Sequence, residues 1–189
     1  MPTPTDEELM YRVMSGEATA LTLLVQRHHG PLLGYLYRMC HANRALAEDL
    51  TQETFIRIMR KTNYQSGRPF KPWLYAIATN LARDHAKSAD TRYAACFDKS
   101  DLPPDAAPGP EELALAAEQG REVAQAIGSL PVEYRAAIAL RFYGGMSLQE
   151  IAAALDIPLG TVKSRLSVGC RKLRERLSNT YEGDEAGHT

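Results

Sequence analysis

The sequence has little of several features that define large classes of protein. Only three cysteines, Cys40, Cys96 and Cys170, occur in 189 residues, and no two of them form a CxxC pair. An odd number without that spacing does not suit a closed disulfide framework. No apolar run approaches the ~20 residues that a membrane-spanning helix needs. The N-terminal stretch MPTPTDEELM also lacks the basic and apolar regions of a signal peptide. We therefore expect a cytoplasmic protein without membrane insertion.

An excess of charge of one sign is also absent, because the formal net charge of the chain is −1. The whole-chain charge therefore predicts no polyanionic partner, but the charged residues are unevenly distributed. Residues 57–92 carry a net charge of +6 and residues 161–176 a net charge of +5, whereas residues 98–118 carry −5. Basic, acidic and basic blocks thus follow one another along the chain.

Apolar residues recur at helical spacing in most of the sequence, and no convincing strand pattern is present. Capping boxes are predicted at Thr5 with Glu8 and at Ser147 with Glu150, where a hydroxyl and a carboxylate satisfy each other's backbone amides. Gly30-Pro31 predicts a break or kink in the first long helical segment, because proline removes an amide donor. These patterns predict an all-α fold.

A proline- and aspartate-rich stretch separates two helical blocks. Residues 98–110 read DKSDLPPDAAPGP, a composition that neither holds a helix nor buries a core. We expect two small helical domains at residues 1–95 and 116–180. A flexible acidic linker at residues 96–115 would join them, and residues 181–189 would form a disordered tail.

The second block contains a helix-turn-helix pattern in MSLQEIAAALDIPLGTVKSRLSVGCRKLRERL, residues 146–177. Leu148, Ile151 and Leu155 form one apolar face, the turn falls at Asp156-Ile157, and Pro158 suits the start of the next helix. The outer side of that second helix carries donors that can reach base edges or phosphates: Thr161, Lys163, Ser164, Ser167 and Arg171. An ordinary amphipathic helix in a bundle is the alternative. The agreement of cap, turn and charge favours DNA binding.

Two blocks of the chain resemble one protein family. LPVEYRAAIALRFYGGMSLQEIAAALDIPLGTVKSRLSVGCRKLRE resembles region 4 of bacterial sigma factors. The segments ALTLLVQRHHGPLLGYLYRMC, AEDLTQETFIRIMR and FKPWLYAIATNLARD resemble region 2. The resemblance covers residues 6–92 and 111–177. The short linker between the blocks resembles that of the extracytoplasmic-function (ECF) group. The resemblance implies a subunit that binds RNA polymerase core, selects promoters and helps to melt the minus-ten element.

The resemblance also implies roles for particular residues. The helix over residues 47–60 would dock on the beta-prime clamp of the polymerase through Glu48, Asp49, Gln52 and Glu53. Charge near a helix N-terminus that complements the dipole is the alternative explanation of these residues. The helix-turn-helix would read the minus-thirty-five element, and the beta flap of the polymerase would be a second contact.

Binding of the minus-ten element is implied for the segment that precedes and includes the FKPWLYAIATNLARD helix. An amide such as Asn80 can read an extruded base, and basic side chains can hold phosphates. Trp73 lies on the apolar stripe and is expected in the core, so Tyr64 and Phe70 are the candidate melting aromatics. The full set is Tyr64, Arg68, Phe70, Lys71, Asn80, Arg83 and Lys87.

Two other functional classes are weighed against a sigma factor. A free-standing helix-turn-helix regulator would bind promoter duplex without core polymerase. An enzyme is disfavoured, because no nucleophile–base pair, phosphate loop or metal signature is present, and no catalytic residue, metal or cofactor is expected. The residues His28-His29 and Cys40-His41 do not have zinc-finger spacing. Cys96 is interpreted as incidental rather than as a redox switch.

The resemblance implies two further partners or roles. An anti-sigma factor would hold the chain inactive. The acidic linker at residues 98–118 would occupy the RNA exit path of the polymerase as an RNA mimic and would set the promoter spacer length. The alternative explanation of the acidic charge is that the linker is a plain solvated tether.

Overall fold

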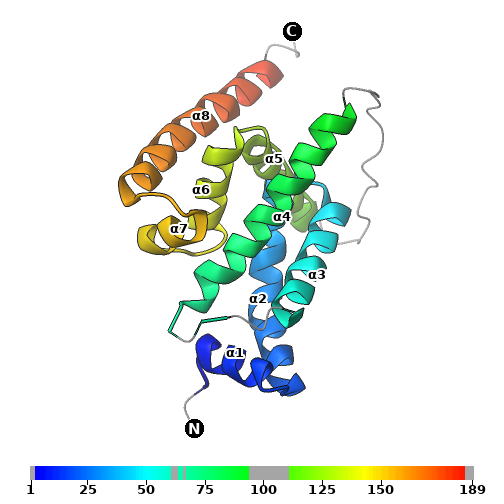
Figure 1. Ribbon diagram of the computed structural model, residues 1–189. Coiled ribbons are helices and arrows are strands. Elements are labelled where there is room, and N and C mark those ends of the chain that lie inside the picture. The colour runs from blue at the N-terminus through cyan, green and yellow to red at the C-terminus, as the bar shows by residue number, and fades with distance from the viewer. Residues whose placement is uncertain (1–2, 61–63, 66, 94–110, 186–189) are drawn as a thin grey trace.

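The computed structural model describes residues 3–60, 64–65, 67–93 and 111–185, and it is all-helical over these ranges (Figure 1). The all-α fold class predicted from the sequence is thereby confirmed for the described part of the chain. The helices, in chain order, are α1 (Asp6–Met14), α2 (Ala18–Met39), α3 (Arg44–Arg60), α4 (Phe70–Tyr93), α5 (Glu111–Gly128), α6 (Val132–Phe142), α7 (Leu148–Leu155) and α8 (Leu159–Glu185).

Both predicted capping boxes are present and start α1 and α7. The Thr5 amide donates to Glu8 Oε2 at 2.8 Å, and the Glu8 amide donates back to Thr5 Oγ1 at 3.2 Å. Ser147 and Glu150 form the same pair of bonds with the same distances. Each box satisfies two amides that the first turn of a helix would otherwise leave unpaired.

Of the break or kink predicted at Gly30-Pro31, a break is absent, because α2 runs through both residues without interruption. Gly30 and Pro31 are exposed, while Leu32 and Leu36 on the other side of the helix are buried. Water can solvate the carbonyl that proline leaves without an amide partner, so the cost of an internal proline is lowered at this position.

Helices α1 to α4 enclose an aromatic-rich core. Tyr35 of α2 and Tyr75 of α4 are fully buried, with ring centroids 5.2 Å apart in an edge arrangement. The Tyr35 and Thr79 hydroxyls lie 2.7 Å apart and share a hydrogen bond, so the buried phenol has a polar partner. Burial raises the pKa of Tyr35, and the phenol stays neutral.

Helices α5 to α8 form the second half, in which α7 and α8 make the predicted helix-turn-helix. Asp156 ends α7 in the left-handed conformation with φ of 53° and turns the chain into α8. Gly145 has φ of 57° in the preceding turn, a value that glycine adopts without steric cost. Ile151 and Leu155 of α7 and Val162 of α8 are buried, which confirms the inward faces expected for both helices.

The two halves pack against each other. Helix α4 contacts α7, and α2 contacts α5 and α6, as Figure 1 shows for α4 and α7. One hydrophobic cluster joins Phe70 and Leu74 of the first half with Met146, Ile151 and Leu155 of the second. The expected linker, residues 96–115, lies outside the described residues as far as residue 110, and α5 begins within it at Glu111. Helix α8 likewise extends to Glu185, into the segment expected as a disordered tail at residues 181–189. The domain boundaries themselves stay a prediction.

Candidate nucleic-acid interface

The outer face of α8 presents hydrogen-bond donors close to the start of the helix. Lys163, Ser164, Ser167 and Arg171 are exposed, and Thr161 is half-buried beside the buried Val162. The Ser164 hydroxyl donates to the Thr161 carbonyl at 3.0 Å, so that hydroxyl keeps its oxygen available as an acceptor. Because α7 packs on α8, this face is held at a defined angle by the turn at Asp156.

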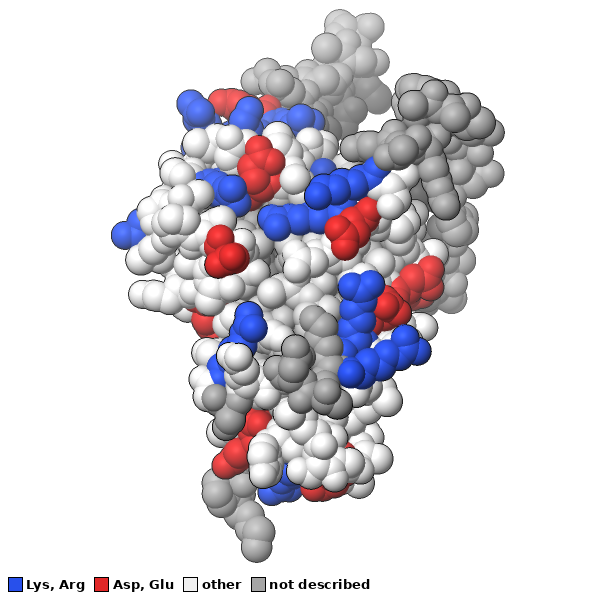
Figure 2. Space-filling model, in the orientation of Figure 1, with Lys and Arg blue, Asp and Glu red and all other residues white. Residues whose placement is uncertain are grey.

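A second polar face lies on α4. Asn80 and Lys87 are exposed and Arg83 is half-buried, whereas Ala78 and Leu81 on the opposite side are buried. Figure 2 shows Lys and Arg side chains along the surface formed by α8 and again over the upper part of α4, with single acidic side chains between them. Both predicted nucleic-acid contact surfaces are therefore accessible to a polyanion.

The two remaining basic residues of the predicted minus-ten set lie near the start of α4. Arg68 is exposed in the segment before the helix. Lys71 is half-buried, and its Nζ donates to the Gly145 carbonyl of the second half at 3.1 Å. One of the predicted phosphate contacts is thus engaged within the chain.

The two rings expected to melt DNA are core residues, which corrects the sequence-based expectation of an exposed aromatic loop. Tyr64 is 7% exposed and Phe70 is 0% exposed. The Tyr64 ring packs against Trp73 at 4.8 Å between centroids, and its hydroxyl donates to the Arg68 carbonyl. The Phe70 amide donates to Glu7 Oε1 at 2.9 Å. Both rings are covered by their packing, and Trp73 is buried as predicted.

The acidic set on α3 is divided between exposed and internally paired groups. Asp49 and Gln52 are exposed, whereas Glu48 and Glu53 are half-buried. The Arg44 Nε lies 2.9 Å from Glu48 Oε1, and the Arg57 Nε lies at the same distance from Glu53 Oε1, each an i,i+4 pair. Such pairs contribute about 0.3–0.5 kcal/mol and leave both groups partly hydrated.

Two apolar side chains that the sequence analysis missed extend this α3 surface. Ile56 is 38% exposed and Met59 is 57% exposed. Their neighbour Ile58 is 1% exposed and is the core residue of this part of α3. Gln52, Ile56 and Met59 follow i, i+4, i+7 spacing, so they share one side of the helix. That spacing is visible in the sequence and is the signal that could have identified them.

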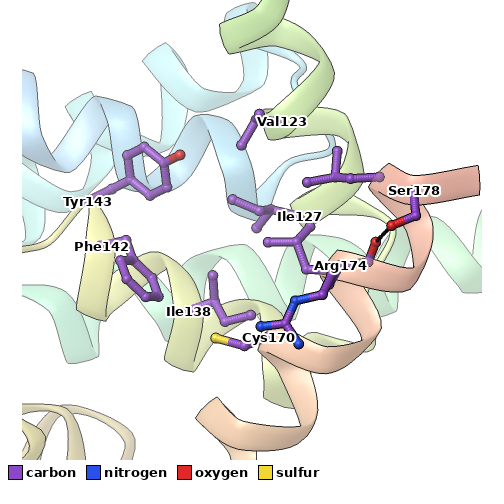
Figure 3. Close-up of a pocket in the computed structure, with 10 residues that line it drawn as sticks. Val123, Ile127, Ile138, Phe142, Tyr143, Cys170, Arg174 and Ser178 are labelled. Atoms are coloured by element: carbon purple, nitrogen blue, oxygen red, sulfur yellow. Dashed lines mark hydrogen bonds between the residues drawn. The ribbon is translucent and has the colours of Figure 1, made fainter. Parts of the chain in front are cut away.

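An apolar groove of 540 Å³ lies between α5, α6 and α8. Figure 3 shows Val123 and Ile127 of α5, Ile138, Phe142 and Tyr143 of the α6 end, and Cys170, Arg174 and Ser178 of α8 around this space. Phe142 is 63% exposed at its edge, an unusual position for a large ring. The sequence analysis did not predict this groove, because it depends on the mutual packing of three helices.

The histidines and cysteine considered for zinc take part in separate contacts. The His28 Nε2 lies 2.7 Å from Asp6 Oδ2, and the His41 Nε2 lies 3.0 Å from Arg135 Nη1. Burial raises the pKa of the Cys40 thiol to about 12. Within the ranges that the structure describes, no cluster of His, Cys, Asp and Glu could hold a metal ion.

Among the same described residues, no helix combines the length and apolar character needed to cross a membrane.

Comparison with known families identifies both halves. Residues 24–92 match Sigma-70 region 2, and residues 120–173 match Sigma-70, region 4. The RNA polymerase sigma-H factor of Pseudomonas aeruginosa is 34% identical over 170 residues, which cover 85% of this chain and 88% of that protein. The ECF RNA polymerase sigma-E factor of Escherichia coli (strain K12) is 32% identical over 188 residues, covering 94% and 95% respectively.

One further relative is longer than this chain. The ECF RNA polymerase sigma factor SigE of Mycolicibacterium smegmatis is 40% identical over 157 residues, and the match covers 82% of this chain but 60% of that relative. Among solved structures, CnrH in complex with the cytosolic domain of CnrY matches with a TM-score of 0.72 and 26% identity, covering 92% of this chain and 97% of that one.

These matches define the class: a two-region protein of the sigma-70 type. The chain belongs to the sigma-70 family of RNA polymerase sigma factors, in the ECF group. An ECF sigma factor directs promoter-specific transcription initiation and is not an enzyme.

Proposed function

We propose that this chain binds RNA polymerase core through α3 and the α5–α6–α8 groove and reads promoter DNA with α4 and α8. The observation that supports this most directly is the pair of exposed polar helix faces, one in each sigma-matched region. A free-standing regulator would need only the face on α8, whereas a promoter-specificity subunit uses both.

Helix α8 is the proposed reader of the minus-thirty-five element. Lys163 and Arg171 are exposed and can contact guanine edges or phosphates, and Ser164 supplies a short hydroxyl that can accept or donate. Lys163 and Ser164 lie in the first two turns of a helix that follows a tight turn, which is the docking geometry of a helix-turn-helix in the major groove, and Arg171 lies about two turns further along α8. Thr161 and Ser167 lie beside them on the same outer side.

Helix α4 is the proposed reader of the minus-ten element. Asn80 is exposed midway along the helix, and its amide can pair with the edge of an extruded base. Arg68, Lys71, Arg83 and Lys87 would hold the phosphates of the melted strand. Tyr64 and Phe70 support this surface by packing beneath it and are not proposed to stack on bases.

The α3 surface is the proposed site for the beta-prime clamp. Asp49 and Gln52 offer polar contacts, and Ile56 and Met59 add apolar area on the same helix. Interfaces that hold large partners combine an apolar centre with a polar rim, and this surface has that composition. Glu48 and Glu53 would form the rim, since each is already paired with an arginine of α3.

The groove between α5, α6 and α8 is the proposed site for the beta flap. An apolar groove of this kind accepts the apolar face of an amphipathic helix. Phe142 at its edge and Ile127 and Ile138 at its floor would supply the contacts.

Two partners or roles remain proposals with less support from the described residues. An anti-sigma protein is proposed because CnrH, which shares the fold over 92% of this chain, was solved bound to the cytosolic domain of CnrY. The acidic linker is proposed as an RNA mimic and spacer ruler on the strength of its charge and composition alone.

A gel-shift experiment with three samples tests the proposed function. Promoter duplex is mixed with the chain alone, with core polymerase alone, and with both. We expect a specific shifted complex only when both are present. A specific complex with the chain alone would favour the free-standing regulator instead.

The clamp surface is tested by Met59→Gln, with Met14→Gln as the matched control because Met14 is 41% exposed on α1. We expect Met59→Gln to weaken core binding and Met14→Gln to leave it unchanged. Equal effects of the two variants would remove Met59 from the proposed interface.

A further inference from the structure

We propose that the groove between α5, α6 and α8 binds one molecule of a free fatty acid, with the alkyl chain on the apolar floor and the carboxylate at Arg174. This binding requires neither DNA nor polymerase. Its consequence for transcription rests on the proposed function of the groove as the site for the beta flap, because a bound fatty acid would exclude the flap.

The floor of the groove is part of the hydrophobic core of the second half. Ile127 of α5 and Ile138 of α6 are each 1% exposed and form one cluster with Leu130. Val123 of α5 and Leu173 of α8 are half-buried and pack against this cluster. Core residues hold the floor in place, so a ligand would meet a groove that is already formed.

The size and composition of the groove match a site for one small molecule. Its volume is 540 Å³. Ligand sites in proteins usually have about 300–1,000 Å³, mostly apolar walls and a few polar groups. Apart from Arg174 and Ser178, the residues that line the groove are aliphatic, aromatic or, in Cys170, a thiol. Such a lining favours an alkyl chain, because each methylene that it covers is removed from water.

Arg174 selects the charge of the head group. It is exposed at the rim of the groove, and Figure 3 shows its side chain extending from α8 toward Cys170 and Ile138. No carboxylate is among the described residues that line the groove. A guanidinium presents two parallel donors that match a carboxylate. The Ser178 hydroxyl already donates to the Arg174 carbonyl at 3.0 Å, which leaves the guanidinium as the donor for the head group.

The alkyl chain contributes more to the affinity than the head group does. An exposed ion pair changes an affinity by a factor of about five at most. Each methylene that moves from water into an apolar site changes it by a factor of about four. The affinity should therefore rise with chain length until the groove is filled. At the efficiency usual for drug-sized ligands, an acid of about twelve carbons has a dissociation constant of about 1 mM or tighter.

Cys170 provides a reporter inside the groove. It is half-buried in the wall formed by α8, whereas Cys40, the other cysteine that the structure describes, is buried in the first half. An alkyl chain lying over Ile138 would cover the Cys170 thiol and slow its alkylation. The reaction of N-ethylmaleimide with this thiol can be followed by peptide mass spectrometry.

Isothermal titration calorimetry of the full chain with dodecanoate tests the site. We expect one molecule bound per chain, an affinity that rises by about fourfold per methylene from octanoate to dodecanoate, and slower alkylation of Cys170 at saturation. Arg174→Gln should weaken dodecanoate binding by about two- to fivefold. Arg176→Gln is the matched control, because Arg176 is exposed on the same helix and does not line the groove. It should leave the affinity unchanged.

The role of Arg174 in charge selection is tested with dodecyltrimethylammonium, which carries the same alkyl chain with a cationic head group. The wild type should bind this cation more weakly than dodecanoate, and Arg174→Gln should remove most of that difference. Four results would overturn the proposal. They are no saturable binding at several times the expected dissociation constant, several molecules bound per chain without protection of Cys170, equal binding of anion and cation by the wild type, and an unchanged affinity in Arg174→Gln.

The effect on the polymerase is measured separately, as binding of core polymerase to a fluorescently labelled chain. Dodecanoate should weaken core binding, octanoate at the same concentration should have little effect, and Arg174→Gln should need about two to five times more dodecanoate. If dodecanoate binds in calorimetry and core binding is unchanged, exclusion of the flap is wrong while the fatty-acid site stands. If the chain does not bind core even without dodecanoate, the proposed function fails and the calorimetric result is unaffected.

Discussion

Replacing Arg135 by methionine should destabilise the chain by about 1–3 kcal/mol for each of the two buried main-chain carbonyls, of Met39 and Leu130, that lose a donor. The guanidinium satisfies two main-chain carbonyls and lies beside one imidazole nitrogen. A hydrogen bond that involves a charged group contributes about 1.5–3 kcal/mol, and an unpaired buried acceptor costs about 1–3 kcal/mol. Burial lowers the pKa of Arg135, which indicates a desolvation cost that offsets part of this gain.

Urea unfolding followed by circular dichroism measures this loss. Arg135→Lys should be intermediate, because an ammonium keeps the charge but cannot reach two carbonyls with a planar fork. Arg121→Met is the control, since Arg121 is exposed on α5 and surface changes usually stay within about 0.5 kcal/mol. A loss below about 1 kcal/mol for Arg135→Met would refute the reasoning, because it would mean that the buried carbonyls need no donor.

Four further predictions concern the reading faces and one cap. Lys163→Ala and Arg171→Ala should each weaken minus-thirty-five binding by the holoenzyme in a footprinting titration, by about 1–3 kcal/mol where a bidentate base contact is lost. Asn80→Ala should spare core binding but reduce permanganate reactivity of the minus-ten region. Ser147→Ala should lower the free energy of unfolding by about 0.5–2 kcal/mol. The backbone hydrogen bond from Ser147 lowers the pKa of Glu150. The stabilisation from this carboxylate is therefore present above pH ~4.5 and is lost on acidification. Glu150→Gln should flatten that part of a pH-dependent unfolding curve.

Local signals in the sequence predicted the helices and the outer face of α8 well. Thr5 with Glu8 and Ser147 with Glu150 mark helix starts through bonds made within four residues, so no tertiary information is needed to place them. The outer residues of α8 follow from helical spacing against buried Val162. Pro31 was misjudged because its cost depends on which side of α2 faces water, and that is decided by packing.

The exposure of aromatic and apolar residues could not be predicted from spacing in the same way. Tyr64 precedes α4, and its burial against Trp73 depends on how the segment folds back over the helix. Ile58 and Met59 are neighbours on α3, and the choice of which one enters the core is set by a few tens of degrees of helix rotation.

Contacts between the halves were the least accessible to sequence reasoning. Nothing in the local sequence distinguishes Arg135 from an ordinary exposed arginine on α6. In the structure it is buried and donates to the carbonyl of Met39, at the end of α2 and 96 positions earlier in the chain. The sequence predicts only that Gly128 ends a helix. Its close approach to the His41 backbone is a tertiary contact between the two halves and has no local sequence signal.

Transcription from a randomised promoter library by purified core polymerase, with and without the chain, tests the central claim most directly. Sequencing of the RNA 5′ ends should reveal start sites that require the chain and share one minus-ten and one minus-thirty-five motif, and Lys163→Ala should lose preference only at the latter. Start sites that are the same with and without the chain would contradict the assignment of this protein as a promoter-specificity subunit.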